Sequence, residues 1–173
     1  MIEIRNVSVD DAEAIAAIYA HHVLHGTATF DVDPLSLDGT RAKIERITAA
    51  GWPFIVAVID GSVVGYAYAT QFRDRAAYRF ACEDSIYVHP NFTGQGIGKA
   101  LVTALCKRSE LAGFRQIIAV AGGGEPASVG VHTACGFEVV GRLEAVGWKK
   151  DRWLEIVYMQ RALGPGSNQP PGA

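Results

Sequence analysis

Three glycines alternate with other residues in the segment Thr93-Gly94-Gln95-Gly96-Ile97-Gly98, which joins a β-rich run to an amphipathic run. Alternate glycines let the main chain approach an anion closely and turn its N–H groups inward. A helix that begins there adds unpaired N–H groups and the positive end of its dipole. The segment therefore predicts a binding site for a phosphate group.

Two other kinds of phosphate loop do not fit this segment. A P-loop carries Gly-Lys followed by Ser or Thr, whereas Ala100 follows Lys99 here and Thr93 stands where the first glycine would be. A dinucleotide loop has the spacing Gly-x-Gly-x-x-Gly, and this segment has Gly-x-Gly-x-Gly. On these residues alone, a bare turn without a ligand remains an alternative.

The residues around the glycines, from Tyr87-Val88-His89-Pro90 to Lys99-Ala100-Leu101, resemble the acetyl-CoA signature of the GNAT acetyltransferase superfamily. The resemblance implies that the loop holds the pyrophosphate of acetyl-CoA and that main-chain groups of residues 86–88 face its pantetheine arm. Thr93 stands where the family has Gln or Arg, which removes a side-chain contact. The cofactor-binding residues implied in this way are Ile86, Tyr87, Val88, Thr93, Gly94, Gln95, Gly96, Ile97, Gly98, Lys99, Glu125 and Ser128.

Three further blocks resemble the phosphinothricin and methionine sulfone (or sulfoximine) acetyltransferases of that superfamily. Residues 75–88 (RAAYRFACEDSIYV) match their central block, residues 27–30 (TATF) their first substrate loop, and residues 147–155 (GWKKDRWLE) their C-terminal block, with Asp151 in place of a glycine. The likeness covers residues 2–163. It implies acetylation of the α-amine of a small amino-acid-like substrate by direct attack on the thioester of acetyl-CoA.

One position departs from the pattern of the family. Glu125 stands where the family usually has Asn, three residues before Ser128. A carboxylate cannot donate a hydrogen bond as an amide does, and it brings negative charge near a polyanionic cofactor. Weaker binding of acetyl-CoA is the expected consequence.

Acetyl transfer to an amine requires a base for the ammonium, a donor for the oxyanion and an acid for the departing thiolate. Glu83 lies among apolar residues and matches the acid of the family, so it is the predicted base; a surface glutamate is the alternative. A main-chain N–H near Val88 is expected to stabilise the oxyanion. The family places Tyr or His at the position of His132, which could protonate the thiolate or serve as the base; a packed or solvated histidine is the alternative.

The connection after residue 72 is rich in arginine, and arginine forks recognise carboxylates bidentately. Arg73, Arg75 and Tyr78 are therefore predicted to face the amine substrate, with Phe30 and Phe72 as walls of the pocket and Lys149 near a second anionic group. A solvated loop and core aromatic residues are the alternatives. Arginine-lined loops favour acidic small molecules over polyamines, whose positive charge they would repel.

The elements that position these residues follow from periodicity and turn signals. Strands are predicted near residues 2–7, 54–59, 63–72, 82–88, 117–120, 137–146 and 152–159, and helices near residues 11–24, 37–50, 99–112 and 127–135. Asp60-Gly61 predicts a hairpin between two of the strands. The order predicts a mixed α/β fold with one sheet. The resemblance implies the GNAT fold, with a mostly antiparallel, twisted central sheet and about four helices on its faces.

Length and composition agree with a single domain, predicted over residues 1–163, and the Pro- and Gly-rich residues 164–173 are predicted to be a disordered tail. The net charge of -2 argues against a nucleic-acid partner, and the N-terminal residues resemble neither a signal peptide nor a membrane anchor, so a cytoplasmic location is expected. Three unpaired cysteines suggest neither a disulfide framework nor a metal site.

Two other functions remain open on the sequence alone. One is an acetyltransferase of the same fold for a polyamine, a peptide or a protein N-terminus. The other is a non-catalytic sensor that binds acyl-CoA, which an absent base would have favoured. The apolar segment from Trp148 to Met159 ends the predicted sheet and is a candidate homodimer interface, as in similar enzymes.

Overall fold

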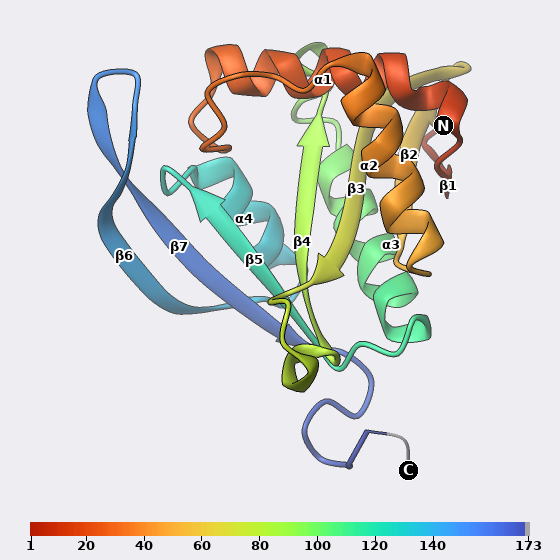
Figure 1. Cartoon of the computed structure of the whole chain (residues 1–173), viewed down its shortest axis with the longest axis vertical. Coiled ribbons are helices and arrows are strands. Elements are labelled where there is room, and N and C mark those ends of the chain that lie inside the picture. The colour runs from red at the N-terminus through yellow and green to blue at the C-terminus, as the bar shows by residue number, and fades with distance from the viewer. Residues whose placement is uncertain (172–173) are drawn as a thin grey trace.

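The structure of the protein is a computed structural model that describes residues 1–171 (Figure 1). Its strands and helices follow the order predicted from the sequence, and the fold class is confirmed. In chain order the main elements are β1 (Glu3–Asn6), α1 (Ala12–His25), α2 (Leu37–Ala49), β2 (Phe54–Ile59), β3 (Ser62–Gln71), β4 (Ala81–Val88), α3 (Ile97–Leu111), β5 (Gln116–Gly122), α4 (Pro126–Ala134), β6 (Glu138–Lys149) and β7 (Arg152–Ala162).

The strands of the described residues form one sheet in the order β1-β2-β3-β4-β5-β7-β6, and β4 with β5 is its parallel pair. That pair is short, because only residues 81–83 of β4 are in register with residues 116–118 of β5. Beyond it the two strands diverge toward their carboxyl ends (Figure 1). The divergence opens a gap in the middle of the sheet.

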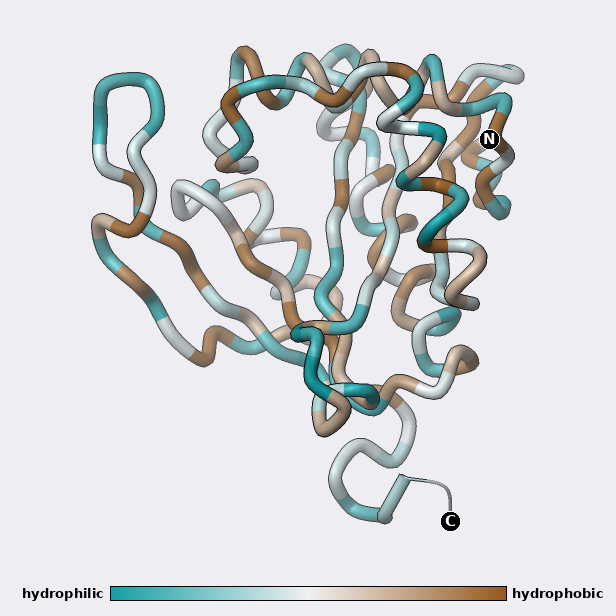
Figure 2. The backbone as a smooth tube through the Cα atoms, in the orientation of Figure 1, coloured by the Kyte–Doolittle hydropathy of each residue, from teal (hydrophilic) through white to brown (hydrophobic). Residues whose placement is uncertain are grey.

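Helices cover both faces of the sheet, and alternation along the strands builds a core on each. Phe54, Val56 and Val58 pack in a cluster with α1 and α2, whereas Ile55 and Ala57 pack in a cluster with α3. Figure 2 shows the apolar segments of the strands lying between the two layers of helices. Because the sheet lies between two helical layers, each β4 side chain points toward one layer or the other.

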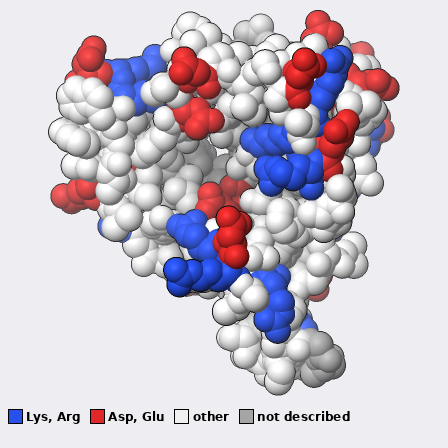
Figure 3. All heavy atoms as spheres, in the orientation of Figure 1, with Lys and Arg blue, Asp and Glu red and all other residues white. Residues whose placement is uncertain are grey.

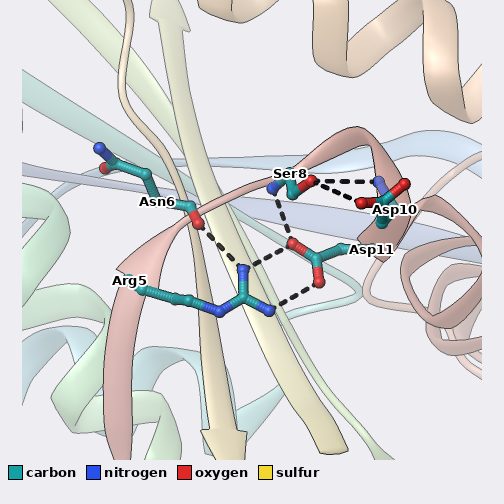
Figure 4. Close-up of polar contacts among 5 residues, drawn as sticks. All are labelled: Arg5, Asn6, Ser8, Asp10 and Asp11. Carbon is teal, nitrogen blue, oxygen red and sulfur yellow. Dashed lines mark hydrogen bonds and ion pairs between the residues drawn. The ribbon is translucent and has the colours of Figure 1, made fainter.

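A capping box leads the chain from β1 into α1 (Figure 4). The Asp11 carboxylate accepts the Ser8 N–H at 2.7 Å, and the Ser8 hydroxyl accepts the Asp10 N–H at 3.3 Å. Arg5 adds a bidentate ion pair to Asp11, with N···O distances of 2.8 and 2.7 Å. Although burial opposes it, Arg5 and the Ser8 N–H hold the pKa of Asp11 below its ordinary value.

The β6–β7 hairpin forms the edge of the sheet and projects beside the gap (Figure 1). Strand β6 is longer than predicted, and it carries a bulge because Leu143 pairs with Ile156 while Gly147 pairs with Leu154. Ala145, inside this bulge, has a left-handed backbone with φ of 52°. A bulge of this kind bends the strand that carries it.

The predicted C-terminal tail begins at Gly164. Residues 164–171 form turns, in which Gly166 N–H donates to the Leu163 carbonyl at 2.9 Å. Residues 172–173 lie outside the described residues. The domain boundary at residue 163 and the disorder of the tail stay predictions.

Candidate active site

A cavity of about 930 Å³ occupies the gap between β4 and β5. Figure 3 shows a hollow in this face of the molecule, with basic and acidic side chains gathered at its lower rim, over the connection between β3 and β4. The predicted site residues that line the cavity are Phe30, Glu83, Ile86, Tyr87, Val88, Thr93, Gly94, Gly96, Ile97, Gly98, Lys99, Glu125, Ser128 and His132.

One end of the cavity is the glycine loop. Gly94 and Gly96 have φ of 74° and 81°, a left-handed conformation that favours glycine, and a Cβ at either would meet nothing within 4 Å. Gly96 caps α3, so the helix begins two residues earlier than predicted. The first helical bond runs from Ala100 N–H to the Gly96 carbonyl, which leaves the N–H groups of the first turn without an acceptor in the helix. The loop and helix end therefore fit a phosphate group.

The middle of the cavity is lined by main-chain groups of β4. Two hydrogen bonds fix the phase of the ladder with β3: His89 N–H donates to the Val64 carbonyl at 2.9 Å, and Phe72 N–H to the Ala81 carbonyl at 3.0 Å. Because bonded and non-bonded pairs alternate in an antiparallel ladder, even-numbered residues of β4 turn their main-chain groups away from β3. Beyond Glu83 these groups face the gap, since β5 no longer runs beside them. The residues concerned are Asp84, Ile86 and Val88.

Glu83 stands on the α1 side of β4 and is half-buried, with one third of its side chain exposed. Its carboxylate lies 3.6 Å from the Arg73 guanidinium. Burial raises the pKa of Glu83, the charge of Arg73 lowers it and that of Asp84 raises it, and the net shift is upward. A carboxylate with a raised pKa is a better proton acceptor than an ordinary surface glutamate.

Asp84 points to the opposite layer and meets His132 of α4. His132 Nε2 donates to the Asp84 carboxylate at 2.9 Å, and Nδ1 donates to the Ser128 carbonyl at 2.7 Å. Both side chains are buried, at 4% and 3% exposure. Burial alone would lower the pKa of His132, but the carboxylate and the carbonyl raise it overall. The acceptor at each nitrogen favours the imidazolium over the neutral ring.

The other end of the cavity is closed by the loop of residues 26–31. The Thr27 hydroxyl donates to the Glu125 carboxylate at 2.5 Å. Gly147 approaches the Phe30 ring so closely that a Cβ would lie 2.3 Å from it. The buried Lys149 ammonium donates to the Thr29 carbonyl at 2.8 Å. Two distant parts of the chain therefore hold Phe30 against the cavity.

Comparison with known proteins identifies the chain. Residues 12–137 match the acetyltransferase (GNAT) family model. The chain is 47% identical over 169 residues to phosphinothricin N-acetyltransferase of Alcaligenes faecalis, covering 97% of this chain and 86% of that one. The chain belongs to the GNAT acetyltransferase family.

Two further relatives agree with this. The L-methionine sulfoximine/L-methionine sulfone acetyltransferase of Pseudomonas aeruginosa is 34% identical, over 96% of this chain and 98% of its own. The crystal structure of a phosphinothricin acetyltransferase from Sinorhizobium meliloti with acetyl-CoA superposes with a TM-score of 0.96 at 45% identity, over 98% and 92% of the two chains. The GNAT member described here is an N-acetyltransferase that uses acetyl-CoA, as the sequence predicted.

Several predicted site residues of this acetyltransferase lie outside the lining of the cavity, as far as residues 1–171 define it: Gln95, Phe72, Arg73, Arg75, Tyr78 and Lys149. Gln95 is exposed. The Arg73 guanidinium lies over the Phe72 ring at 4.1 Å, and Tyr78 contacts that ring at a centroid distance of 5.8 Å, so these three form a cluster at the rim. Lys149 is buried under the loop that it anchors, and burial lowers its pKa.

Sequence reasoning missed several residues that line the cavity, among them His22, Asp84, Val146 and Ile156. Asp84 could have been found, because alternation places it opposite Glu83, on the buried face of an apolar strand, where a carboxylate needs a partner. Val146 lies in the bulge of β6 and lines the cavity. No pattern in the neighbouring residues predicts this bulge. Over residues 1–171, no helix could cross a membrane and no cluster of His, Cys, Asp and Glu could hold a metal ion.

Proposed function

We propose that this protein acetylates the α-amine of a small amino-acid-like substrate of the phosphinothricin, methionine sulfone or methionine sulfoximine type. One observation carries the proposal: the half-buried Glu83 carboxylate, with its raised pKa and with Arg73 3.6 Å away, lines the cavity that the glycine loop also lines. The relatives at 47% and 34% identity carry these substrates in their names.

The cofactor end of the cavity suits acetyl-CoA, which supplies an activated acetyl thioester when bound. The glycine loop and the first turn of α3 would hold the pyrophosphate through N–H groups. The outward-facing main-chain groups of Ile86 would bind amide groups of the pantetheine arm. Glu125 lines the same cavity and adds a negative charge to it.

Glu83 is the proposed base that takes a proton from the substrate ammonium. The Val88 N–H, turned toward the gap, would stabilise the negative charge that develops on the thioester oxygen. The base role does not suit His132, because an imidazolium has no free electron pair for a proton. The predicted role of proton donor is not retained either, since both of its N–H groups are bound to Asp84 and the Ser128 carbonyl. His132 is proposed to hold α4 against β4.

Arg73 and Arg75 are proposed to bind the carboxylate of the amino-acid substrate at the rim of the cavity. Arg73 is half-exposed and already lies beside Glu83, so it can meet a carboxylate close to the base. Phe30 would pack against the substrate side chain. Lys149 is not proposed as a substrate contact, because its ammonium is bound to the Thr29 carbonyl.

A thiol-release assay with acetyl-CoA tests the substrate proposal. The panel contains phosphinothricin, methionine sulfone, methionine sulfoximine, ordinary amino acids, a peptide with a free N-terminus and a polyamine. We expect turnover with the first three and a larger amine KM for Arg73→Ala and Arg75→Ala at an unchanged KM for acetyl-CoA. Turnover of the polyamine or the peptide alone would contradict the proposal. Thermal stabilisation by acetyl-CoA without turnover of any amine would indicate a sensor.

A homodimer through the β6–β7 hairpin is the second part of the proposal. Strand β6 is an edge strand whose exposed side chains include large apolar ones. They are Val139, Val140, Leu143, Val146 and Trp148, with Trp153 beside Trp148 on β7. Sedimentation equilibrium should give a dimer for the wild-type chain and a monomer for the double variant Val140→Lys, Trp153→Lys. A wild-type monomer at micromolar concentration would contradict the proposed dimer.

A cytoplasmic location is also proposed. The three cysteines are free and buried, which suits a reducing compartment. Separation of cell fractions, followed by detection of the chain in the soluble cytoplasmic fraction, tests this location.

A further inference from the structure

His22 of α1 contacts the end of β4, beside the cavity. Its Nε2 lies 2.8 Å from the Val88 carbonyl oxygen, although 66 positions separate the two residues in the chain. The imidazole packs against the Tyr87 ring at a centroid distance of 5.4 Å, and Tyr87 packs in turn against Tyr19 of α1 at 5.1 Å. His22 and Val88 both line the cavity. The contact is therefore part of the site, and the chemistry described above gives His22 no role.

The partner of His22 is a main-chain group that the sheet leaves unpaired. Val88 is the last residue of β4, and its N–H and carbonyl face the gap rather than β3. The following peptide is tied to the sheet on one side, because His89 N–H donates to the Val64 carbonyl at 2.9 Å. His22 ties the same peptide on its other side. With both sides bonded, the peptide between Val88 and His89 is held in place. This limits rotation about Val88, through which the preceding peptide, which carries the Val88 N–H, is joined to it.

The hydrogen bond also fixes the chemical state of the ring. A carbonyl can only accept, so Nε2 carries the hydrogen and donates it. Burial lowers the pKa of His22, and the Val88 carbonyl opposes that shift without reversing it. The charges nearby are those of Glu125, which favours the protonated ring, and of His21 and His89, which disfavour it. His22 is therefore a neutral imidazole in its Nε2–H form near neutral pH.

We infer that His22 is a positioning residue for acetyl transfer, which holds the peptide after Val88 and so limits rotation at Val88 that would turn the Val88 N–H away from the developing oxyanion. The inference rests on the proposed role of that N–H. A donor aimed in advance contributes to catalysis because it needs no reorientation during the reaction. Removing the hydrogen bond frees the last peptide of β4 to turn, and small misplacements of catalytic groups are costly in rate.

Three substitutions at one position separate positioning from proton transfer. Phe keeps the shape of the ring without a donor. Gln places an amide N–H where Nε2 stands but does not titrate, and Asn carries the same amide too close to the helix to reach Val88. His25→Phe, at an exposed position of the same helix, is the matched control. Melting temperature and acetyl-CoA binding are measured for each variant.

We expect kcat at saturating substrates to fall about tenfold in His22→Phe and in His22→Asn. His22→Gln should stay within about twofold of the wild type, as should His25→Phe, because the donor to Val88 is kept in both. If His22→Gln is as slow as His22→Phe, His22 transfers a proton in the reaction and the inference is overturned. A wild-type rate in His22→Phe overturns it as well. Should the Phe variant fail to fold, the comparison of Gln with Asn still decides.

A second measurement does not depend on turnover. Long-range ¹H–¹⁵N spectra of the histidine rings, with the His22 signals assigned by their loss in His22→Gln, should show the neutral Nε2–H form in the protein without substrate. The Nδ1–H form at neutral pH would contradict the hydrogen bond itself and overturn the inference, and the imidazolium would contradict the neutral state assigned to the ring. Because this result precedes any reaction, it separates failure of the inference from failure of the proposed substrate or of the oxyanion role.

Discussion

The two ends of the cavity are built in different ways. The proposed cofactor end consists of main-chain groups from one continuous stretch, from Ile86 to Lys99, with glycines that free the backbone. The proposed amine end consists of side chains from segments far apart in the sequence: Phe30, Glu83, Val146 and Ile156. A contiguous main-chain site is visible as a motif, whereas a site of converging side chains depends on the fold.

Because the two ends are built differently, substitutions in them should affect different substrates. The proposed main-chain end would bind the pyrophosphate whatever its side chains are, so we expect it to tolerate Thr93 in place of Gln or Arg. At the side-chain end, one substitution could change which amine binds. Substitutions at the amine end should therefore change the KM of the amine, and strain in the glycine loop should change the KM of acetyl-CoA.

The largest effect is expected at Glu83. Glu83→Gln removes the proposed base and should lower kcat/KM for the amine by about a hundredfold or more. Because the pKa of Glu83 is raised, wild-type activity should rise with pH above the range of an ordinary glutamate, as the carboxyl loses its proton. A pH profile of kcat/KM checks both effects, and the limb due to Glu83 should vanish in the variant. Glu138→Gln, exposed on β6, is the control. Equal rates for Glu83→Gln and the wild type would remove Glu83 from the chemistry.

The next effect is expected where β6 meets the loop of residues 26–31. In Gly147→Ala the new Cβ would lie 2.3 Å from the Phe30 ring, so the ring must leave its place at the cavity. The KM of the amine should rise at least about tenfold, and the KM of acetyl-CoA should stay the same. Gly141→Ala on the same strand is a matched control, because a Cβ there meets nothing within 4 Å. If both KM values rise together, the two ends are not separable.

Strain in the glycine loop should give the opposite pattern. Gly96 has φ of 81°, and an alanine in that conformation costs about 1 to 2 kcal/mol. Gly96→Ala should raise the KM of acetyl-CoA about fivefold and leave that of the amine unchanged, because relaxation of the loop disturbs its N–H groups. Gly113→Ala carries similar strain at φ of 94°, beyond the end of α3, and separates lost stability from lost binding. Were Gly113→Ala to change the KM of acetyl-CoA equally, the loop would have no special role.

The same contrast explains what could be predicted from the sequence. Capping at Ser8, the turn at Asp60-Gly61 and the glycine loop are local, so residue types a few positions apart determine them. The pairing of Asp84 with His132 spans 48 positions and requires β4 and α4 to be in place. The burial of Lys149 depends on a bulge and on a loop 120 positions away. Resemblance to the family predicted roles for Glu83 and His132, but only the fold shows that both ring nitrogens of His132 lie at hydrogen-bond distance from acceptors.

Glu125 lies between the two ends of the cavity, and its substitution is expected to change the KM values least. Its carboxylate lines the cofactor cavity and also accepts the Thr27 hydroxyl at 2.5 Å. Glu125→Asn removes the negative charge and supplies an amide donor, so the KM of acetyl-CoA should fall about two- to threefold. The shorter side chain no longer reaches Thr27, and the KM of the amine should rise by a similar factor as the loop loosens.

Thr27→Val separates the two consequences of the Glu125 substitution, because it removes the hydroxyl donor and keeps the carboxylate. It should reproduce the rise in the KM of the amine without the fall in the KM of acetyl-CoA. Steady-state kinetics of both variants with both substrates provides the measurement. An unchanged or higher KM of acetyl-CoA in Glu125→Asn would show that the carboxylate does not oppose the cofactor. Its contact with Thr27 would then be its whole contribution, and Glu125 would belong to the amine end.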